Sequence, residues 1–151
     1  MNVKPVLVCT ALALTVSLAV SLSPAQAHDD KDPRHIAMTS LGKNMKAIGK
    51  GLRSGSITPE MKSQAQEIVD VSDRLVSLFP KEDHQAKDSR AKPEIWTDMA
   101  GFRKANQNFQ AAARAFVKAL SGTDVAAAQA AQKNVGKTCG GCHKPYRLPK
   151  K

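Results

Sequence analysis

Cys139-Gly140-Gly141-Cys142-His143, close to the C-terminus, is the stretch that decides how the rest of the chain is interpreted. Two cysteines three positions apart, followed at once by a histidine, form the attachment signature of a c-type haem. On a helix, Cys139, Cys142 and His143 occupy positions i, i+3 and i+4 and therefore share one face. The two thiols can then bind the vinyl groups of one porphyrin while the imidazole ligates its iron. The motif predicts one covalently attached haem c.

Three other uses of these cysteines are weaker. A closed zinc site needs a fourth ligand, usually from a second paired cluster, and His28, His35 and His84 are scattered. A redox-active dithiol of the thioredoxin type belongs in a βαβ setting, and strand patterns are poor in this chain. A disulfide between Cys139 and Cys142 would be strained on a helix and would close too small a loop to stabilise much.

The N-terminal segment has the pattern of a secretory signal peptide. Lys4 supplies the basic start, an apolar run extends from Val6 to Leu22, and Ala25-Gln26-Ala27 is an A-x-A cleavage site. The alternative is a membrane anchor, but the run is marginal for a span of roughly 20 residues. We therefore expect residues 1–27 to be cleaved and residues 28–151 to form one domain in the bacterial periplasm, without a membrane anchor.

The chain is strongly basic, with 23 Lys and Arg against 13 Asp and Glu and a formal net charge of +10. Such a surface fits nucleic acid, an anionic membrane or an acidic protein. Export argues against nucleic acid, and no alternation of basic and aromatic residues builds a stacking groove. Acidic redox partners remain as one interpretation, and a merely solvated lysine-rich surface is the other.

Helical signals account for nearly all of the remaining sequence. Apolar residues recur at three and four positions, and proline, glycine and acidic caps mark the boundaries. One antiparallel four-helix bundle of the all-α class is predicted, with the haem held on the fourth helix against the first. The four segments are 33–54, 58–79, 93–121 and 123–147, with a polar surface loop at 81–92.

The first segment carries one apolar stripe and two glycines on one side. Gly42 and Gly49 are seven residues apart and leave the same side of the helix bare. This spacing suggests that another helix or a flat ligand comes close there. The stripe consists of Met38, Leu41, Met45, Ile48 and Leu52.

The position of the haem motif on the last of four helices carries a family resemblance. Together with Gly136-Lys137-Thr138 before it and Tyr146-Arg147 after it, the motif resembles that of the cytochrome c-prime family, the class II c-type cytochromes. Gly42-Lys43-Asn44-Met45 is similar to part of the family's first helix, and Pro93-Glu94-Ile95-Trp96 to the start of its third. The resemblance covers essentially the whole of residues 28–151.

The resemblance implies a role for Arg34 and Met38, which have the Arg-x-x-x-Met spacing of the family's low-spin branch. In that branch the methionine is the distal iron ligand opposite the histidine, here His143, and the arginine lies near the haem propionates. Arg147 is a second candidate for a propionate contact. High-spin members instead leave the sixth position open, usually under an apolar residue, and bind small gases.

Each of these assignments has a plainer alternative. A methionine on a helix stripe is more often flexible core filling than a ligand, and Met45, Met61 and Met99 are also candidates in principle. Arg34 can be a solvated arginine at a helix start, and a cation such as Arg147 is favourable at a helix end without any haem.

The function expected from sequence is that of a periplasmic, mono-haem, low-spin cytochrome that carries single electrons between protein partners and is not an enzyme. The alternative is a five-coordinate haem protein that binds or senses gases such as NO or CO. The resemblance also implies that a homodimer through the first two helices is open to this chain.

Overall fold

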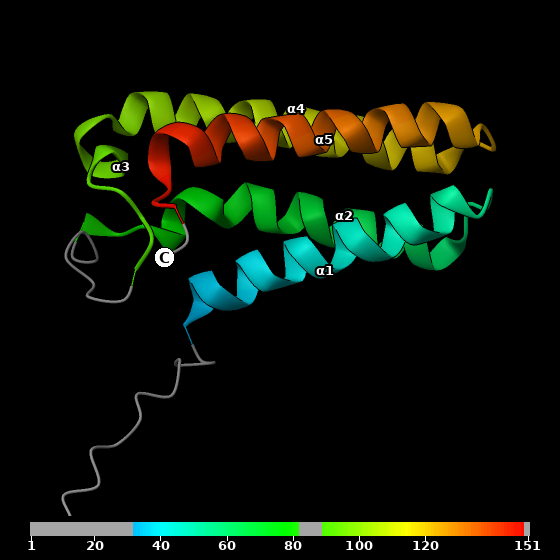
Figure 1. Ribbon diagram of the computed structural model, residues 1–151, viewed down its shortest axis with the longest axis horizontal. Coiled ribbons are helices and arrows are strands. Elements are labelled where there is room, and N and C mark those ends of the chain that lie inside the picture. The colour runs from blue at the N-terminus through cyan, green and yellow to red at the C-terminus, as the bar shows by residue number, and fades with distance from the viewer. Residues whose placement is uncertain (1–31, 82–88, 150–151) are drawn as a thin grey trace, which may run out of the picture.

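Four long helices form an antiparallel bundle in the computed structural model, which describes residues 32–81 and 89–149 (Figure 1). The predicted all-α four-helix bundle is confirmed. The predicted signal peptide, residues 1–27, lies outside the described residues. The long helices are α1 (Pro33–Arg53), α2 (Pro59–Arg74), α4 (Met99–Ser121) and α5 (Val125–Tyr146), and the short ones are the 3₁₀ helix η1 (Leu75–Leu78) and α3 (Glu94–Thr97).

Side-chain caps start three of the long helices where the sequence predicts them. Asp32, Thr58 and Asp124 each accept a hydrogen bond from a backbone N–H two or three residues later. These oxygens satisfy donors that have no partner inside the helix. Proline follows Asp32 and Thr58 directly, at a position where its missing N–H costs nothing.

The helices form a ring in which each one packs against the next in sequence, and α1 closes the ring on α5. The core lies inside this ring. In the second predicted segment, apolar residues are buried at helical spacing from Met61 to Phe79. In the third, four large apolar residues are buried, while Trp96 and Met99 are half-buried. The four are Phe102, Phe109, Phe116 and Leu120. Within the described ranges, no helix is both long and apolar enough to cross a bilayer.

The second predicted segment does not stay α-helical to its end. The α-helix stops at Arg74, and Leu75–Leu78 continue as a 3₁₀ turn before Pro80. The Ser72 hydroxyl donates to the carbonyl of Val69 at 2.6 Å, which loosens the helical ladder one turn earlier. A 3₁₀ turn is a common way to tighten the end of a helix.

The third predicted segment is interrupted at Asp98, so it forms two helices instead of one. Asp98 leaves the helical conformation and its carboxylate accepts the backbone N–H of Gly101 at 3.0 Å, which makes it the N-cap of α4. The same carboxylate accepts a hydrogen bond from the Tyr146 hydroxyl at 2.7 Å. This second bond comes from the last turn of α5, and it ties the break to the helix that carries the haem motif.

Aromatic rings extend this tie into the core. The ring of Tyr146 meets Phe102 edge-on at 5.3 Å between centroids, and Phe102 meets Phe79 in the same way at 5.0 Å. Edge-to-face pairs of this kind contribute beyond the area that they bury. A Cβ atom at Gly101 would lie 2.5 Å from the Tyr146 hydroxyl oxygen, so only glycine fits beside the Asp98–Tyr146 bond.

The largest loss of stability is expected from Phe116, which is fully buried on α4. Phe116→Ala should lower the free energy of unfolding by about 3–5 kcal/mol, because it removes a large apolar side chain and leaves a cavity. The exposed Lys118→Ala, on the same helix, should change it by less than about 0.5 kcal/mol. Urea denaturation of both variants measures the difference, and similar losses would contradict the assignment of this core.

Tyr146 should make stability fall at high pH. Its hydrogen bond to Asp98, and then burial, raise the pKa of the phenol to about 12. An unfolded tyrosine has a pKa of about 10, so the stabilisation is complete below pH about 10 and is lost as the pH rises toward about 12. Wild type should therefore lose more stability than Tyr146→Phe between pH about 9 and about 11.5, as measured by urea denaturation. Equal losses in both proteins would show that this bond is not formed.

Candidate haem-binding site

The haem motif, residues 139–143, lies on α5 and ends three residues before Tyr146, which anchors the last turn of that helix. Cys139 and Cys142 are half-buried and pack against the core of the bundle, and the two thiols are not joined to each other. Burial raises the pKa of the Cys139 thiol, and burial together with Cys139 raises that of Cys142 to about 11. Both groups are therefore protonated at neutral pH, which disfavours thiolate-based disulfide chemistry.

His143 follows at the exposed outer edge of the same helix face. Partial desolvation of the ring by its neighbours, and then the positive charges of Arg147 and Arg90, lower the pKa of its imidazole below the ordinary value. A neutral imidazole is the form that ligates a metal, because the ligating nitrogen must carry a free lone pair. The surroundings of His143 thus favour the ligand form at neutral pH.

The helix opposite this motif is α1, and side-chain amides of α5 fix how the two are aligned. Gln132 Nε2 donates to the carbonyl of Met45 at 2.8 Å, and Gln129 Nε2 donates to that of Leu52 at 2.9 Å. Gln132 also lies against Gly49, where an added Cβ would come within 3.0 Å of its amide. We call this line of contact between α1 and α5 the seam.

The seam sets which residues of the two helices are level with each other. Met38 lies 11 residues before Gly49, and His143 lies 11 residues after Gln132. Eleven residues make about three full turns of an α-helix. Met38 therefore points in the same direction as Gly49, and His143 in the same direction as Gln132. Because the helices run in opposite directions, Met38 and His143 reach the same level of the bundle from opposite helices.

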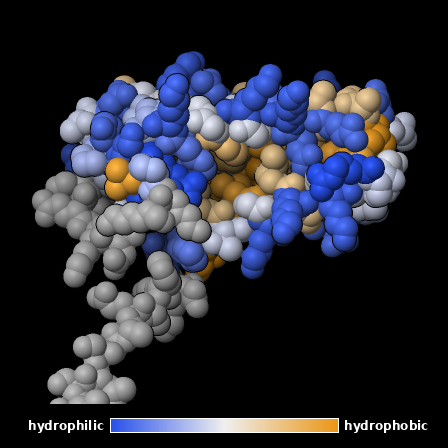
Figure 2. All heavy atoms as spheres, in the orientation of Figure 1, coloured by the Kyte–Doolittle hydropathy of each residue, from blue (hydrophilic) through white to orange (hydrophobic). Residues whose placement is uncertain are grey.

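On the side of the seam that carries the haem motif, α1 and α5 move apart. Figure 1 shows the helices diverging from the seam toward the start of α1 and the end of α5. Figure 2 shows apolar surface in a hollow between them, bordered by hydrophilic side chains. Met38, Leu41 and Met45 are half-buried and pack against the core from this side of α1.

The groups around this hollow fit a covalently bound haem. The two thiols, the neutral imidazole and a thioether on the facing helix are the attachment and ligand groups that haem c uses. Gly136, three residues before Cys139, is exposed, and a Cβ atom added there would meet nothing within 4 Å, so the bundle does not fill the space beside the motif. The predicted site residues are thus brought to one end of the bundle.

The glycine prediction is half confirmed. Gly49 makes the close approach expected between α1 and another helix, whereas Gly42 has no atom within 4 Å of an added Cβ. The physical reason is that α1 and α5 diverge (Figure 1), and that Gly42 precedes the residues of α1 that contact α5 in the seam. For Gly42 no helix comes close, and the flat ligand, the other alternative, stays a prediction.

The two arginines predicted at the haem edge lie at the same end of the molecule. The side chain of Arg34 is 14% exposed, lies 3.8 Å from the carboxylate of Asp32, and its guanidinium carbon is 5.1 Å from the centre of the Phe79 ring. Arg147 is exposed and forms an isolated backbone bridge with Ala91. Arg34 is thus held firmly one turn before Met38, while the side chain of Arg147 points into solvent.

Two supports of the site were not predicted from the sequence. One is the bond between Asp98 and Tyr146; the other is Arg90, whose guanidinium donates twice to the carbonyl of Leu148, at 2.7 and 3.1 Å. Both hold the end of α5 just after His143. The helix-cap spacing from Asp98 to Gly101 is a signal that could have revealed the break, but a bond across 48 residues leaves no local pattern.

The described residues lend no support to the zinc alternative. In the ranges 32–81 and 89–149, no three His, Cys, Asp or Glu side chains come together as a metal site.

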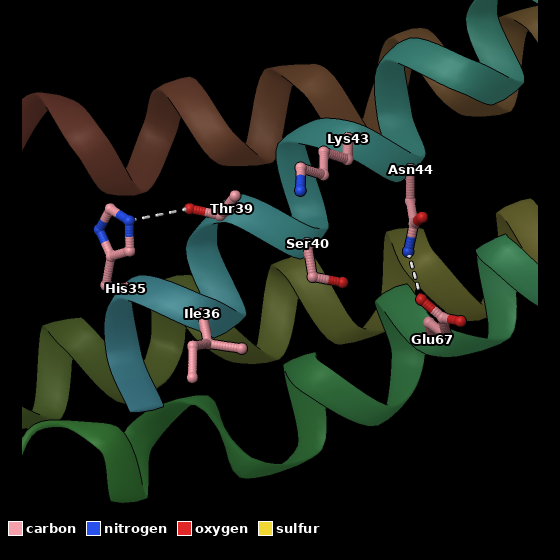
Figure 3. Close-up of a pocket in the computed structure, with 7 residues that line it drawn as sticks. All are labelled: His35, Ile36, Thr39, Ser40, Lys43, Asn44 and Glu67. Carbon is pink, nitrogen blue, oxygen red and sulfur yellow. Dashed lines mark hydrogen bonds between the residues drawn. The ribbon is translucent and has the colours of Figure 1, made fainter. Parts of the chain in front are cut away.

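A pocket of about 440 Å³ lies on the outer side of α1, toward α2 (Figure 3). His35 and Ile36 line it, and Asn44 donates to Glu67 across it at 2.7 Å. It faces away from Met38 and is separate from the hollow, and His35 is exposed.

Comparison with known proteins assigns the chain. The family model described as Cytochrome C' matches residues 30–147. Cytochrome c-554 of Cereibacter sphaeroides is 34% identical over 150 residues, covering 91% of this chain and 95% of its own. A structure of a cytochrome c' with ligand-controlled dimer dissociation is 25% identical with a TM-score of 0.71, over 77% of this chain and 92% of that one.

A further neighbour carries a gas. It is the nitric oxide complex of a variant of cytochrome c prime from Alcaligenes xylosoxidans, which is 24% identical with a TM-score of 0.68, over 78% of this chain and 91% of that one. At this identity the likeness concerns the fold. Motif, hollow and relatives agree: the chain belongs to the cytochrome c' family and is a c-type cytochrome with covalently attached haem.

Proposed function

We propose that this protein is a mono-haem electron carrier in which Met38 ligates the iron opposite His143. The observation that supports this best is the equal offset of the two residues from the seam, 11 positions each in opposite directions. A thioether is a soft ligand that suits iron in both oxidation states and raises its potential relative to harder ligands. With Met38 and His143 both as ligands, no ligand position would be left open for a substrate.

Each residue of the site then has one task. Cys139 and Cys142 form the thioether links, and His143 is the proximal ligand. Arg34 and Arg147 contact the propionates, and burial of the Arg34 side chain favours the first of these contacts. The bound haem supplies one-electron redox chemistry; the chain fixes its ligands, excludes water and presents a docking surface. The protein acts in the periplasm after loss of its signal peptide, and it is not an enzyme.

Reversible binding of a small gas, such as nitric oxide or carbon monoxide, is the second candidate. The observation in its favour is the neighbour with bound nitric oxide, and on this evidence the comparisons favour gas binding over electron transfer. Met38 itself supports electron transfer. The two functions differ in the occupant of the sixth position, so a spectrum separates them.

Replacement of Met38 tests the axial ligand. The reduced wild-type protein should give a sharp low-spin α band, and the oxidised protein a near-infrared band from methionine-to-iron charge transfer. Met38→Ala should lose both and give a broad high-spin spectrum that shifts at once with carbon monoxide, because the sixth position is open.

Met45→Leu is the matched control, since Met45 lies on the same side of α1 but at the seam. It should leave both bands in place. A wild-type protein with a high-spin spectrum would refute electron transfer by His/Met ligation and support the gas-binding candidate. An unchanged spectrum in Met38→Ala would point to another ligand, such as Met45.

Covalent attachment has its own test. Haem should stay with the denatured wild-type chain in acidified organic solvent, because thioether bonds survive unfolding. The doubly substituted Cys139→Ala/Cys142→Ala protein should release all of its haem under the same conditions. Absorbance of the separated protein fraction measures the retained haem, and complete release from wild type would refute covalent attachment by these cysteines.

A further inference from the structure

The two helices beside the hollow carry no acidic residue. Along its whole length α1 has five cationic side chains and no Asp or Glu, and α5 has three cations and likewise no acid. The acids are concentrated on α2, where four of them are exposed. In the ring of helices α2 is diagonally opposite α5. The four acids are Glu60, Glu67, Asp70 and Asp73.

Cations follow directly after the residues of the seam and after the haem-ligating histidine. Lys46 comes after Met45, Lys50 after Gly49 and Lys133 after Gln132, and the pattern recurs in Leu52-Arg53 and His143-Lys144. We call Lys46, Lys50, Arg53, Lys133 and Lys144 the basic rim.

The direction of these side chains follows from helix geometry. One residue further along an α-helix turns the side chain by about 100°. Because α1 and α5 run in opposite directions, this step turns both rows toward the same side of the seam, which is the outer side away from the core. All five residues are exposed, and none of them forms an ion pair with any residue in the described part of the chain.

We propose that the basic rim, which follows the seam on the two helices that hold the haem, forms the docking surface for an acidic electron-transfer protein. This inference rests on the proposed function and names the partner's chemistry. Exposed charges of one sign raise the rate of encounter with an oppositely charged partner and orient it before contact.

Other anionic partners fit this surface less well. Single-stranded nucleic acid needs exposed aromatic rings for base stacking; α1 has none, and the one aromatic residue of α5, Tyr146, is buried. A membrane surface needs apolar side chains that insert beside the cations. Ile36 and Leu148 are the large apolar residues with high exposure in the described ranges, and neither belongs to the seam.

A pair of charge reversals on the rim, compared with an equal pair elsewhere, tests the proposal. Lys46→Glu/Lys133→Glu alters both sides of the seam, and Lys62→Glu/Arg74→Glu makes the same change of net charge on α2, at two exposed positions. The probe is reduced flavodoxin, an acidic flavoprotein, whose electron transfer to the oxidised holoprotein is followed by stopped-flow absorbance.

At low ionic strength the rim variant should react at least about 10-fold more slowly than wild type, and the α2 variant no more than about threefold more slowly. At an ionic strength of about 0.5 M the three rates should converge, because the charges are screened. Calorimetric titration with oxidised flavodoxin should show the same order of affinities, which provides a readout without electron transfer.

Equal slowing in the two variants would overturn the proposal, since only net charge would then matter. So would a rim variant that reacts like wild type but loses binding to phosphatidylglycerol vesicles, because the surface would then serve a membrane. The haem spectra of both variants should match wild type. If Met38 proves not to ligate iron, its spectrum shows this separately, and the comparison between rim and α2 keeps its meaning.

Discussion

The amide of Gln132 against the backbone of α1 is the interaction on which the arrangement of the haem end depends. It donates to the carbonyl of Met45 and lies over Gly49, where an added Cβ would crowd the amide. A polar tie of this kind fixes the register more strictly than apolar packing, because a hydrogen bond is lost over a small displacement. Register in turn decides which residue of α1 reaches the level of His143.

Away from the contact of Gln132 with α1, the bundle is open on one side, between α1 and α5. The other neighbouring helices share a continuous apolar core, from Phe116 and Leu120 on α4 to Ile68 on α2. Between α1 and α5 the apolar side chains are only half-buried toward the hollow, as for Met38 and Cys142. Part of the apolar surface of this small domain therefore remains for a prosthetic group to cover, and covering it adds to the stability of the fold.

The fold could be predicted from the sequence because its helix signals are local. Asp32, Thr58 and Asp124 cap helices through bonds to backbone only two or three residues away, and the buried stripes repeat with the helical period. The break at Asp98 escaped prediction because Pro93-Glu94 gives a valid helix start and the stripe continues through it. What interrupts that helix is Tyr146, which is distant in sequence.

The residues of the candidate site also differ in how far the sequence alone reveals them. Cys139, Cys142 and His143 are recognisable because their chemistry depends on spacing along one helix. Met38 needs the alignment of two helices, and that alignment comes from Gln132, a residue that looks like an ordinary polar position in the sequence. Gly42 shows the converse: its spacing from Gly49 suggests that a helix or a flat ligand comes close, but only the structure shows that no helix does.

The separation of acids on α2 from cations on α1 and α5 also gives the molecule an electric dipole moment. A dipole in the field of a charged surface experiences a torque, so the protein rotates before it touches anything. Near an acidic surface the side of the bundle that turns forward is the one opposite α2, where α5 lies. The protein is therefore already partly oriented toward its partner before the two surfaces touch.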